Sequence, residues 1–110
     1  MSIAREVKAI IRQSKLEEVL EELHKIAGIP GATVSLVRGF GKPRPKGGPG
    51  LDEAPMYKLE IVVSPEMVQA VLDGIGRAAW TGQPGDGKVF VYEVAQVANI
   101  RMKAQGLGAL

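Results

Sequence analysis

The chain of 110 residues has the length of one compact domain, with 45% hydrophobic and 24% charged residues. A formal net charge of +2 is too small to predict nucleic-acid binding. The absence of cysteine and the single histidine exclude disulfides, zinc–thiolate sites, thiol catalysis and a multi-histidine metal site within one chain. No apolar run approaches the roughly 20 residues of a membrane span, and no apolar signal segment opens the chain. We therefore expect a cytoplasmic protein without membrane insertion.

The first part of the chain predicts a strand, a helix and a second strand. Residues 5–12 alternate apolar and polar side chains, which is typical of a strand with one mostly polar face. Ser14 and Glu17 fit a capping box, and apolar residues recur at helical spacing over residues 16–26. Residues 32–40 predict the second strand.

The second part predicts a long loop, a strand, a helix and a last strand. Residues 39–55 contain five glycines and four prolines, a composition that indicates an irregular segment. Residues 56–63 alternate again and predict the third strand. Ser64-Pro65 is a typical helix start, and the helical pattern runs to Trp80. A glycine turn then leads to the fourth strand, over residues 88–94.

The order βαββαβ predicts an α+β, ferredoxin-like fold: an antiparallel sheet with two helices on one face. The other sheet face must then meet solvent or a partner. Six apolar residues are candidates for that face: Ile10, Val34, Leu36, Val62, Phe90 and Tyr92. An apolar second face predicts an oligomer, unless some of these side chains line the single core.

The sequence does not favour an enzyme. It lacks the G-x-S-x-G and H-E-x-x-H motifs, and it has no cysteine nucleophile. His24 lies among charged residues on the predicted solvent-facing side of the first helix. No pair of carboxylates has a spacing that requires acid/base catalysis. We therefore predict a protein that binds rather than catalyses.

One glycine-rich segment could bind an anion. Residues 82–88 spell G-x-x-x-x-G-K, in which backbone N–H groups can converge on a phosphate while Lys88 adds a positive charge. Two features differ from a Walker A loop: Val89 follows the lysine, and the segment joins a helix to a strand. A helix cap followed by a tight turn explains the same residues, so the spacing alone leaves both interpretations open.

Two further segments could be either solvated surface or functional elements. Residues 39–55 could form a solvated insertion, but structureless loops of this length inside small domains commonly make functional contacts. The basic residues Arg101 and Lys103, close to the C-terminus, could be solvated or could close over an anion.

Taken together, several of these segments resemble the PII signal-transduction family. The most specific is T-G-Q-P-G-D-G-K-V-F-V over residues 81–91, supported by V-R-G-F-G over residues 37–41 and K-L-E-I-V-V over residues 58–63. The resemblance covers nearly the whole chain. It implies one PII-like domain over residues 1–110, with a T-loop at about 41–54, a B-loop at about 81–88 and a C-terminal segment at about 96–110.

The resemblance implies a homotrimer with adenine nucleotides in the clefts between subunits. We predict no metal, since the chain has no cysteine and one histidine. It also implies a T-loop that changes shape with ligand and docks on a target enzyme or transporter. By this resemblance Thr33 and Val62 hold the adenine, Gly39, Gly41 and Lys42 form the base of the T-loop, and Gly85, Asp86, Gly87, Lys88 and Arg101 contact the phosphates.

Departures from the family pattern point away from the nitrogen-sensing members. The T-loop is shorter, and it contains no tyrosine to serve as a uridylylation site. Met56 replaces a lysine that can reach the terminal phosphate, and Asn99 replaces a phosphate-binding arginine. Each charge-assisted contact contributes roughly 1.5–3 kcal/mol, so we predict that ADP or AMP is favoured over ATP.

These departures are similar to PII-like branches that are carboxysome-associated or encoded beside transporters. The former makes bicarbonate a candidate second ligand, and we expect little response to 2-oxoglutarate. An alternative function is a trimeric module that binds a small anion or a metal without sensing nucleotide. A slow ATPase is disfavoured by the missing contacts to the distal phosphate.

Overall fold

The fold is a four-stranded antiparallel sheet with two helices. The computed structural model describes the backbone of residues 3–43 and 51–110, and the side chains of residues 3–39 and 54–110. The elements are β1 (Ala4–Arg12), α1 (Leu16–His24), β2 (Thr33–Pro43), β3 (Leu51–Val63), α2 (Val68–Ala79) and β4 (Gly87–Val94), with short 3-10 turns at Gln13–Lys15, Pro65–Met67 and Gly106–Ala109. The strand order β2-β3-β1-β4 confirms the predicted ferredoxin-like arrangement. In the described part, neither helix is long and apolar enough to cross a membrane.

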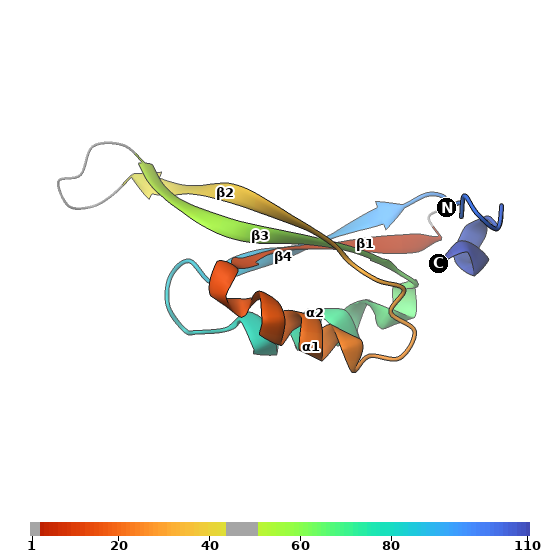
Figure 1. The fold of residues 1–110 in the computed structure, drawn as a ribbon, viewed down its shortest axis with the longest axis horizontal. Coiled ribbons are helices and arrows are strands. Elements are labelled where there is room, and N and C mark those ends of the chain that lie inside the picture. The colour runs from red at the N-terminus through yellow and green to blue at the C-terminus, as the bar shows by residue number, and fades with distance from the viewer. Residues whose placement is uncertain (1–2, 44–50) are drawn as a thin grey trace.

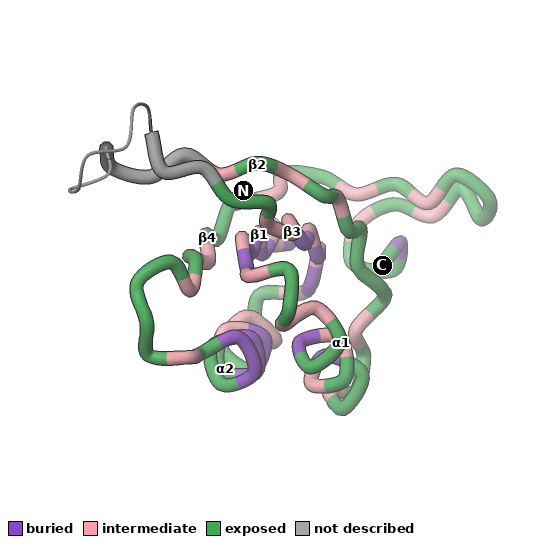
Figure 2. Tube along the Cα trace, turned by 60° about the vertical axis from the view of Figure 1, so that its left-hand side comes forward, coloured by how far each residue is buried: buried purple, intermediate pink, exposed green. Residues whose placement is uncertain are grey.

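Both helices pack on the same face of the sheet (Figure 1). The alternation in β1 and β3 directs every second side chain toward the helices. Those side chains and their helical partners form a core that is at most 2% exposed: Val7, Ala9 and Ile11 from β1, Leu59, Ile61 and Val63 from β3, Val19 and Leu23 from α1, and Val71 and Ile75 from α2. The buried positions lie between sheet and helices in Figure 2. No polar or charged side chain of the described residues is buried, so the core is held by apolar packing.

The strand register decides which apolar residues lie on the open face of the sheet. Glu6 pairs with both Val62 and Tyr92, and Lys8 pairs with Phe90, so these residues all face away from the helices. Phe90 is 43% exposed and Tyr92 45%. These pairings, with Ile10 on the same face, confirm four of the six residues predicted for it.

Val34 and Leu36 correct that prediction. They pair with Leu59 and Tyr57, and therefore lie on the helix side of the sheet. Both are nevertheless exposed, Leu36 at 61%, because β2 is an edge strand. Their exposure comes from their place at the edge and not from the open face.

The open face also carries charged side chains. The Lys8 ammonium lies 4.7 Å from the centre of the Tyr92 ring, a cation–π contact. Lys58 and Glu60 form an ion pair at 3.7 Å. Partial burial, followed by a hydrogen bond with Glu60, raises the pKa of Glu6. A face that mixes aromatic rings with ion pairs is suited to contact with another protein surface.

The predicted capping box at the start of the first helix is wrong. Gln13–Lys15 forms a 3-10 turn, so α1 begins at Leu16 and Lys15 occupies the N-cap position without a side-chain cap bond. Ser14 therefore lies inside the turn instead of at the helix boundary. The Lys15 ammonium instead contacts Glu18 at 3.3 Å.

The irregular segment predicted for residues 39–55 is shorter than expected. β2 continues to Pro43 and β3 begins at Leu51, so part of the glycine- and proline-rich stretch forms a hairpin. β3 pairs with β1 only from Met56 to Val63, and the residues of β3 before Met56 pair with β2 alone. A strand with one neighbour has an open edge, where a missing proline N–H need not remove a ladder bond. The centre of the expected T-loop, residues 44–50, lies outside the described residues.

Candidate functional site

The segment from Thr81 to Gly87, which we call the glycine loop, joins α2 to β4. Gly82, Gly85 and Gly87 have φ angles of +85°, +95° and +105°, in the left-handed region that favours glycine. A Cβ atom on Gly87 would lie 1.8 Å from the carbonyl oxygen of Ile10. Glycine is therefore required for β4 to begin beside β1, and the predicted glycine turn is confirmed.

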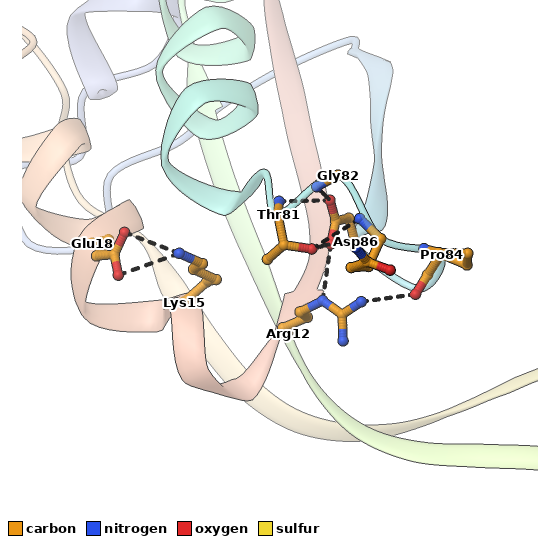
Figure 3. Close-up of polar contacts among 8 residues, drawn as sticks. Arg12, Lys15, Glu18, Thr81, Gly82, Pro84 and Asp86 are labelled. Carbon is orange, nitrogen blue, oxygen red and sulfur yellow. Dashed lines mark hydrogen bonds and ion pairs between the residues drawn. The ribbon is translucent and has the colours of Figure 1, made fainter.

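The carboxylate of Asp86 organises the glycine loop from within (Figure 3). The Thr81 N–H donates to Oδ2 at 2.7 Å and the Gly82 N–H donates to the same oxygen at 3.0 Å. The Thr81 hydroxyl and the Arg12 Nε donate to Oδ1, the latter at 2.9 Å. The hydrogen bonds from Thr81, and then the contact with Arg12, hold the pKa of Asp86 well below its usual range. Each carboxylate oxygen thus accepts two hydrogen bonds, which matches its capacity.

This geometry indicates how Asp86 can serve a ligand. Because all its acceptor positions are occupied inside the protein, Asp86 would have to break a loop contact to accept a hydrogen bond from a ligand. Asp86 lies next to residues that are predicted to contact phosphate, namely Gly85, Gly87 and Lys88. Its own hydrogen bonds, however, hold the shape of the glycine loop.

Arg12, at the end of β1, is a member of this cluster that the sequence analysis missed. Its Nη2 donates to the carbonyl oxygen of Pro84 at 2.7 Å, in addition to the Nε contact with Asp86 (Figure 3). In the sequence, the single indication of a role for Arg12 was that it is the last polar residue in the alternating pattern of β1. Its two partners are more than seventy residues away in the chain, so no local pattern indicates them.

A cleft of about 810 Å³ lies where three parts of the fold meet: the end of β1, the base of the β2–β3 hairpin and the glycine loop. Ile10 and Met56 provide apolar surface, and Gly39 approaches the Met56 Cγ closely enough that a Cβ would lie 3.5 Å from it. Lys88 lines the other side. Within the described residues, no carboxylate forms an ion pair with Lys88. The cleft therefore combines an apolar wall with a cation suited to an anionic ligand.

The structure brings together half of the predicted site residues. Gly39, Gly85, Asp86, Gly87 and Lys88 all line the cleft. Gly41 and Lys42 follow Gly39 along β2, and the Lys42 side chain lies outside the described residues. Thr33, Val62 and Arg101 do not line this cleft.

Val62 lies toward the opposite end of the open face, and Thr33 lies on the edge strand β2, level with Lys8. Ile10 pairs with Lys58 and Lys88, whereas Glu6 pairs with Val62 and Thr33 pairs with Glu60. Lys58 and Val62 are four residues apart on β3, which corresponds to about 13 Å at the rise of a strand. One chain therefore does not combine these residues with the glycine loop.

Arg101 is exposed in a turn of the C-terminal segment, at the end of the sheet remote from the glycine loop (Figure 1). Ala98 pairs with Gln105 across this turn, and the Asn99 N–H donates to the Ala104 carbonyl at 2.8 Å. The Asn99 side chain accepts from the Met102 N–H at 3.0 Å. Asn99 is thus engaged in shaping the turn that presents Arg101.

The described residues contain no group of three or more histidine, cysteine, aspartate or glutamate side chains that could hold a metal ion. Fold and site together define a small α+β ligand-binding domain. Its cleft lies beside a glycine loop that follows the second helix and is lined by the cation of Lys88.

Comparison with known proteins identifies the family. The profile of the family described as "Nitrogen regulatory protein P-II" matches residues 4–104. A P-II protein of Bradyrhizobium diazoefficiens is 40% identical over 114 aligned positions, covering 96% of this chain and 99% of the relative. The P-II 1 protein of Escherichia coli strain K12 is 44% identical over 105 positions, covering 88% and 91%. This chain therefore belongs to the nitrogen regulatory protein P-II family, a family of regulatory proteins.

Solved structures agree with this assignment. A complex of B. subtilis GlnK with ATP has a TM-score of 0.84 and 36% identity, and the match covers 98% of each chain. Arabidopsis thaliana PII bound to citrate has a TM-score of 0.84 and 38% identity, with 99% of this chain and 94% of that chain covered. The PII resemblance and the fold predicted from the sequence are confirmed.

Proposed function

We propose that this protein is a regulatory protein that binds an adenine nucleotide and passes the bound state to a target through residues 41–54. One observation carries the proposal: the loop of Gly85, Asp86, Gly87 and Lys88 lines a cleft together with Gly39, at the base of the hairpin that leads to those residues. A nucleotide phosphate at Lys88 would therefore touch the hairpin base and bias its shape. The ATP bound by the similar GlnK of B. subtilis supports this ligand class.

The site is completed by a second subunit in this proposal. Thr33, Val62 and Arg101 lie away from the glycine loop in one chain, so a neighbouring copy would supply them. The exposed rings of Phe90 and Tyr92 give the open face apolar surface that another copy would cover. The assembly that satisfies both requirements is the homotrimer implied by the PII resemblance.

The nucleotide preference follows from the charges at the cleft. Met56 brings a thioether to the cleft wall where the family pattern has a lysine. The side chain of Asn99 is engaged in the C-terminal turn. Without the lysine and the arginine of the family pattern, the terminal phosphate of ATP makes fewer charge-assisted contacts than the inner phosphates. ADP or AMP is therefore favoured over ATP. Bicarbonate is a candidate second ligand beside the nucleotide.

Titration calorimetry with AMP, ADP and ATP tests the ligand class. We expect heat with ADP and AMP, and weaker binding of ATP. Lys88→Ala should weaken ADP binding by roughly tenfold or more, as expected for the loss of a charge-assisted contact. Lys25→Ala, which removes a 73%-exposed lysine at the C-terminal end of α1, is the matched control and should bind as wild type. The absence of heat with all three nucleotides would refute the proposal.

The mass in solution tests the assembly. We expect three times the mass of the 11.7-kDa chain. Phe90→Lys should shift the mass toward the monomer because it places a charge on the apolar part of the open face. Leu36→Lys, also exposed but on the helix side, is the control and should leave the mass unchanged. A wild-type protein that is monomeric at micromolar concentration would contradict the shared site.

The alternative of a small-anion module predicts a different titration. Heat with bicarbonate or inorganic phosphate, without any heat from the three nucleotides, would favour it. Lys88→Ala should then abolish that heat.

A further inference from the structure

The Trp80 ring lies beside Gly82, but the glycine loop itself contributes no buried apolar side chain. Gly82, Gln83, Pro84 and Gly85 are all exposed, and the loop forms no regular element. Its shape therefore depends on a small number of polar contacts. Besides the four hydrogen bonds to Asp86, these are the Gln83 N–H to the Thr81 hydroxyl at 3.1 Å and the Arg12 Nη2 to the Pro84 carbonyl at 2.7 Å.

Among these contacts, those of Arg12 come from outside the loop. Thr81, Gly82 and Gln83 all belong to the loop, so their bonds can move with it as one unit. Arg12 instead ends β1, a strand that pairs with β3 on one side and β4 on the other. It contacts the loop at Asp86 and also at Pro84, two residues earlier. Contacts at these two residues fix the orientation of the glycine loop as well as its position.

We propose that Arg12 is a positioning residue for the anion site: it ties the glycine loop to β1, so that the loop backbone stays aligned beside Lys88 of β4 before a ligand arrives. This inference rests on the proposed nucleotide-binding function and deepens it. A loop that is already ordered loses less conformational entropy on binding, which raises affinity without adding a contact to the ligand.

The chemistry of the guanidinium explains why arginine is needed at this place. Its planar fork presents Nε to a carboxylate oxygen and Nη2 to a carbonyl at the same time. Lysine carries the same charge as a single point and cannot reproduce this pair of directed bonds. Arg12→Lys therefore separates geometry from charge.

The test uses wild-type protein and Arg12→Lys, with Arg77→Lys on the exposed side of α2 as the matched control. Amide hydrogen exchange without ligand is measured at Thr81, Gly82 and Gln83, whose N–H groups donate hydrogen bonds within the loop. We expect faster exchange at these three amides in Arg12→Lys, with no change in the core strands and no change at all in Arg77→Lys. Unchanged exchange in Arg12→Lys would overturn the proposal.

Ligand titrations followed by NMR chemical shifts provide the second readout. ADP should bind Arg12→Lys roughly tenfold or more weakly, whereas adenosine, which lacks phosphate, should bind as it does to wild type. Equal losses for ADP and adenosine would contradict a role confined to the phosphate loop. If Arg12→Lys bound ADP as tightly as wild type, charge alone would suffice and positioning would be refuted.

Asp86→Asn keeps the test decisive if Arg12→Lys folds poorly. It weakens the acceptor of Arg12 without changing β1, and it should cause the same faster exchange at Gly82. Where both single variants fold, the two losses of ADP affinity should be less than additive in the double variant, because both changes disrupt the contact between Arg12 and Asp86. Additive losses would refute the coupling. If wild-type protein bound no nucleotide, the proposed function would fail, and the ligand-free exchange would still decide the role of Arg12.

Discussion

The core and the glycine loop are ordered by opposite kinds of interaction. Between the sheet and the helices, the buried side chains of the described residues are all apolar. In the glycine loop, by contrast, a carboxylate at the centre accepts hydrogen bonds from Thr81, Gly82 and Arg12. Apolar burial does not depend on pH or on the direction in which two groups meet. The glycine loop, in contrast, depends on charge and on the geometry of its hydrogen bonds. The stable part and the candidate binding part can therefore be changed separately.

The largest effect is expected in the core. Leu59→Ala should lower the free energy of unfolding by about 2–5 kcal/mol, because Leu59 is fully buried and the change leaves a cavity. Urea unfolding measures this loss. Leu36→Ala is the control on the neighbouring strand: Leu36 is 61% exposed on the same sheet side and should lose less than about 0.5 kcal/mol. Equal losses in both variants would show that the core is not where the structure places it.

The next effect is expected at the junction of the two regions. Gly87→Ala should destabilise the fold by about 2–4 kcal/mol, from a left-handed backbone and from the contact with the Ile10 carbonyl. Gly106→Ala carries the backbone cost alone, since φ is +75° with no atom within 4 Å of the added Cβ, and should lose about 1–2 kcal/mol. Thermal unfolding compares the two. A Gly87→Ala variant no less stable than Gly106→Ala would contradict the close approach of β1 and β4.

A smaller, pH-dependent effect is expected at Asp86. Because the folded state lowers its pKa, the carboxylate contributes stability at neutral pH that is lost as the pH falls below the unfolded value of about 3.8. Asp86→Asn should therefore be less stable than wild type at pH 7, and the difference should shrink as the pH falls toward 3. Urea unfolding across this range measures it. A difference between Asp86→Asn and wild type that stays constant over this pH range would argue against an ionic role.

The smallest effect is expected from an ion pair outside the loop. The Lys25 ammonium lies 3.5 Å from Glu22 and the lysine side chain is 73% exposed. Lys25→Ala should change the free energy of unfolding by less than about 0.5 kcal/mol, since exposed pairs gain little in water. Chemical denaturation measures this against Arg12→Ala, for which we expect a clearly larger loss. If the two variants lost equally little, the contacts of Arg12 would be no different from an ordinary surface pair.

The order and type of the main elements could be predicted from the sequence. Alternation in β1 and β3 is a local property, and it correctly predicted which of their side chains form the core. The match of residues 81–91 to the PII family correctly indicated the family. The start of α1 was wrong because a capping pattern competes with other local geometries, here the Gln13–Lys15 turn.

The side assigned to Val34 and Leu36 was wrong for a different reason. Which face a strand residue takes depends on its register with the neighbouring strand, and a shift of one residue reverses every side chain. Pairing of Val34 with Leu59 is a property of the assembled sheet. The predicted extent of the irregular hairpin segment was wrong for the same reason, since strand pairing extended both ends.

The sequence by itself determined the apolar periodicity, the glycine positions of the loop and the residues that mark the family, because each of these depends on neighbours along the chain. Only the tertiary structure decided that Arg12 contacts Pro84 and Asp86, and that both carboxylate oxygens of Asp86 accept hydrogen bonds from the protein itself. The Arg12 contacts join segments more than seventy residues apart, and they exist because the pairing of β1 with β4 brings the end of one strand to the start of the other.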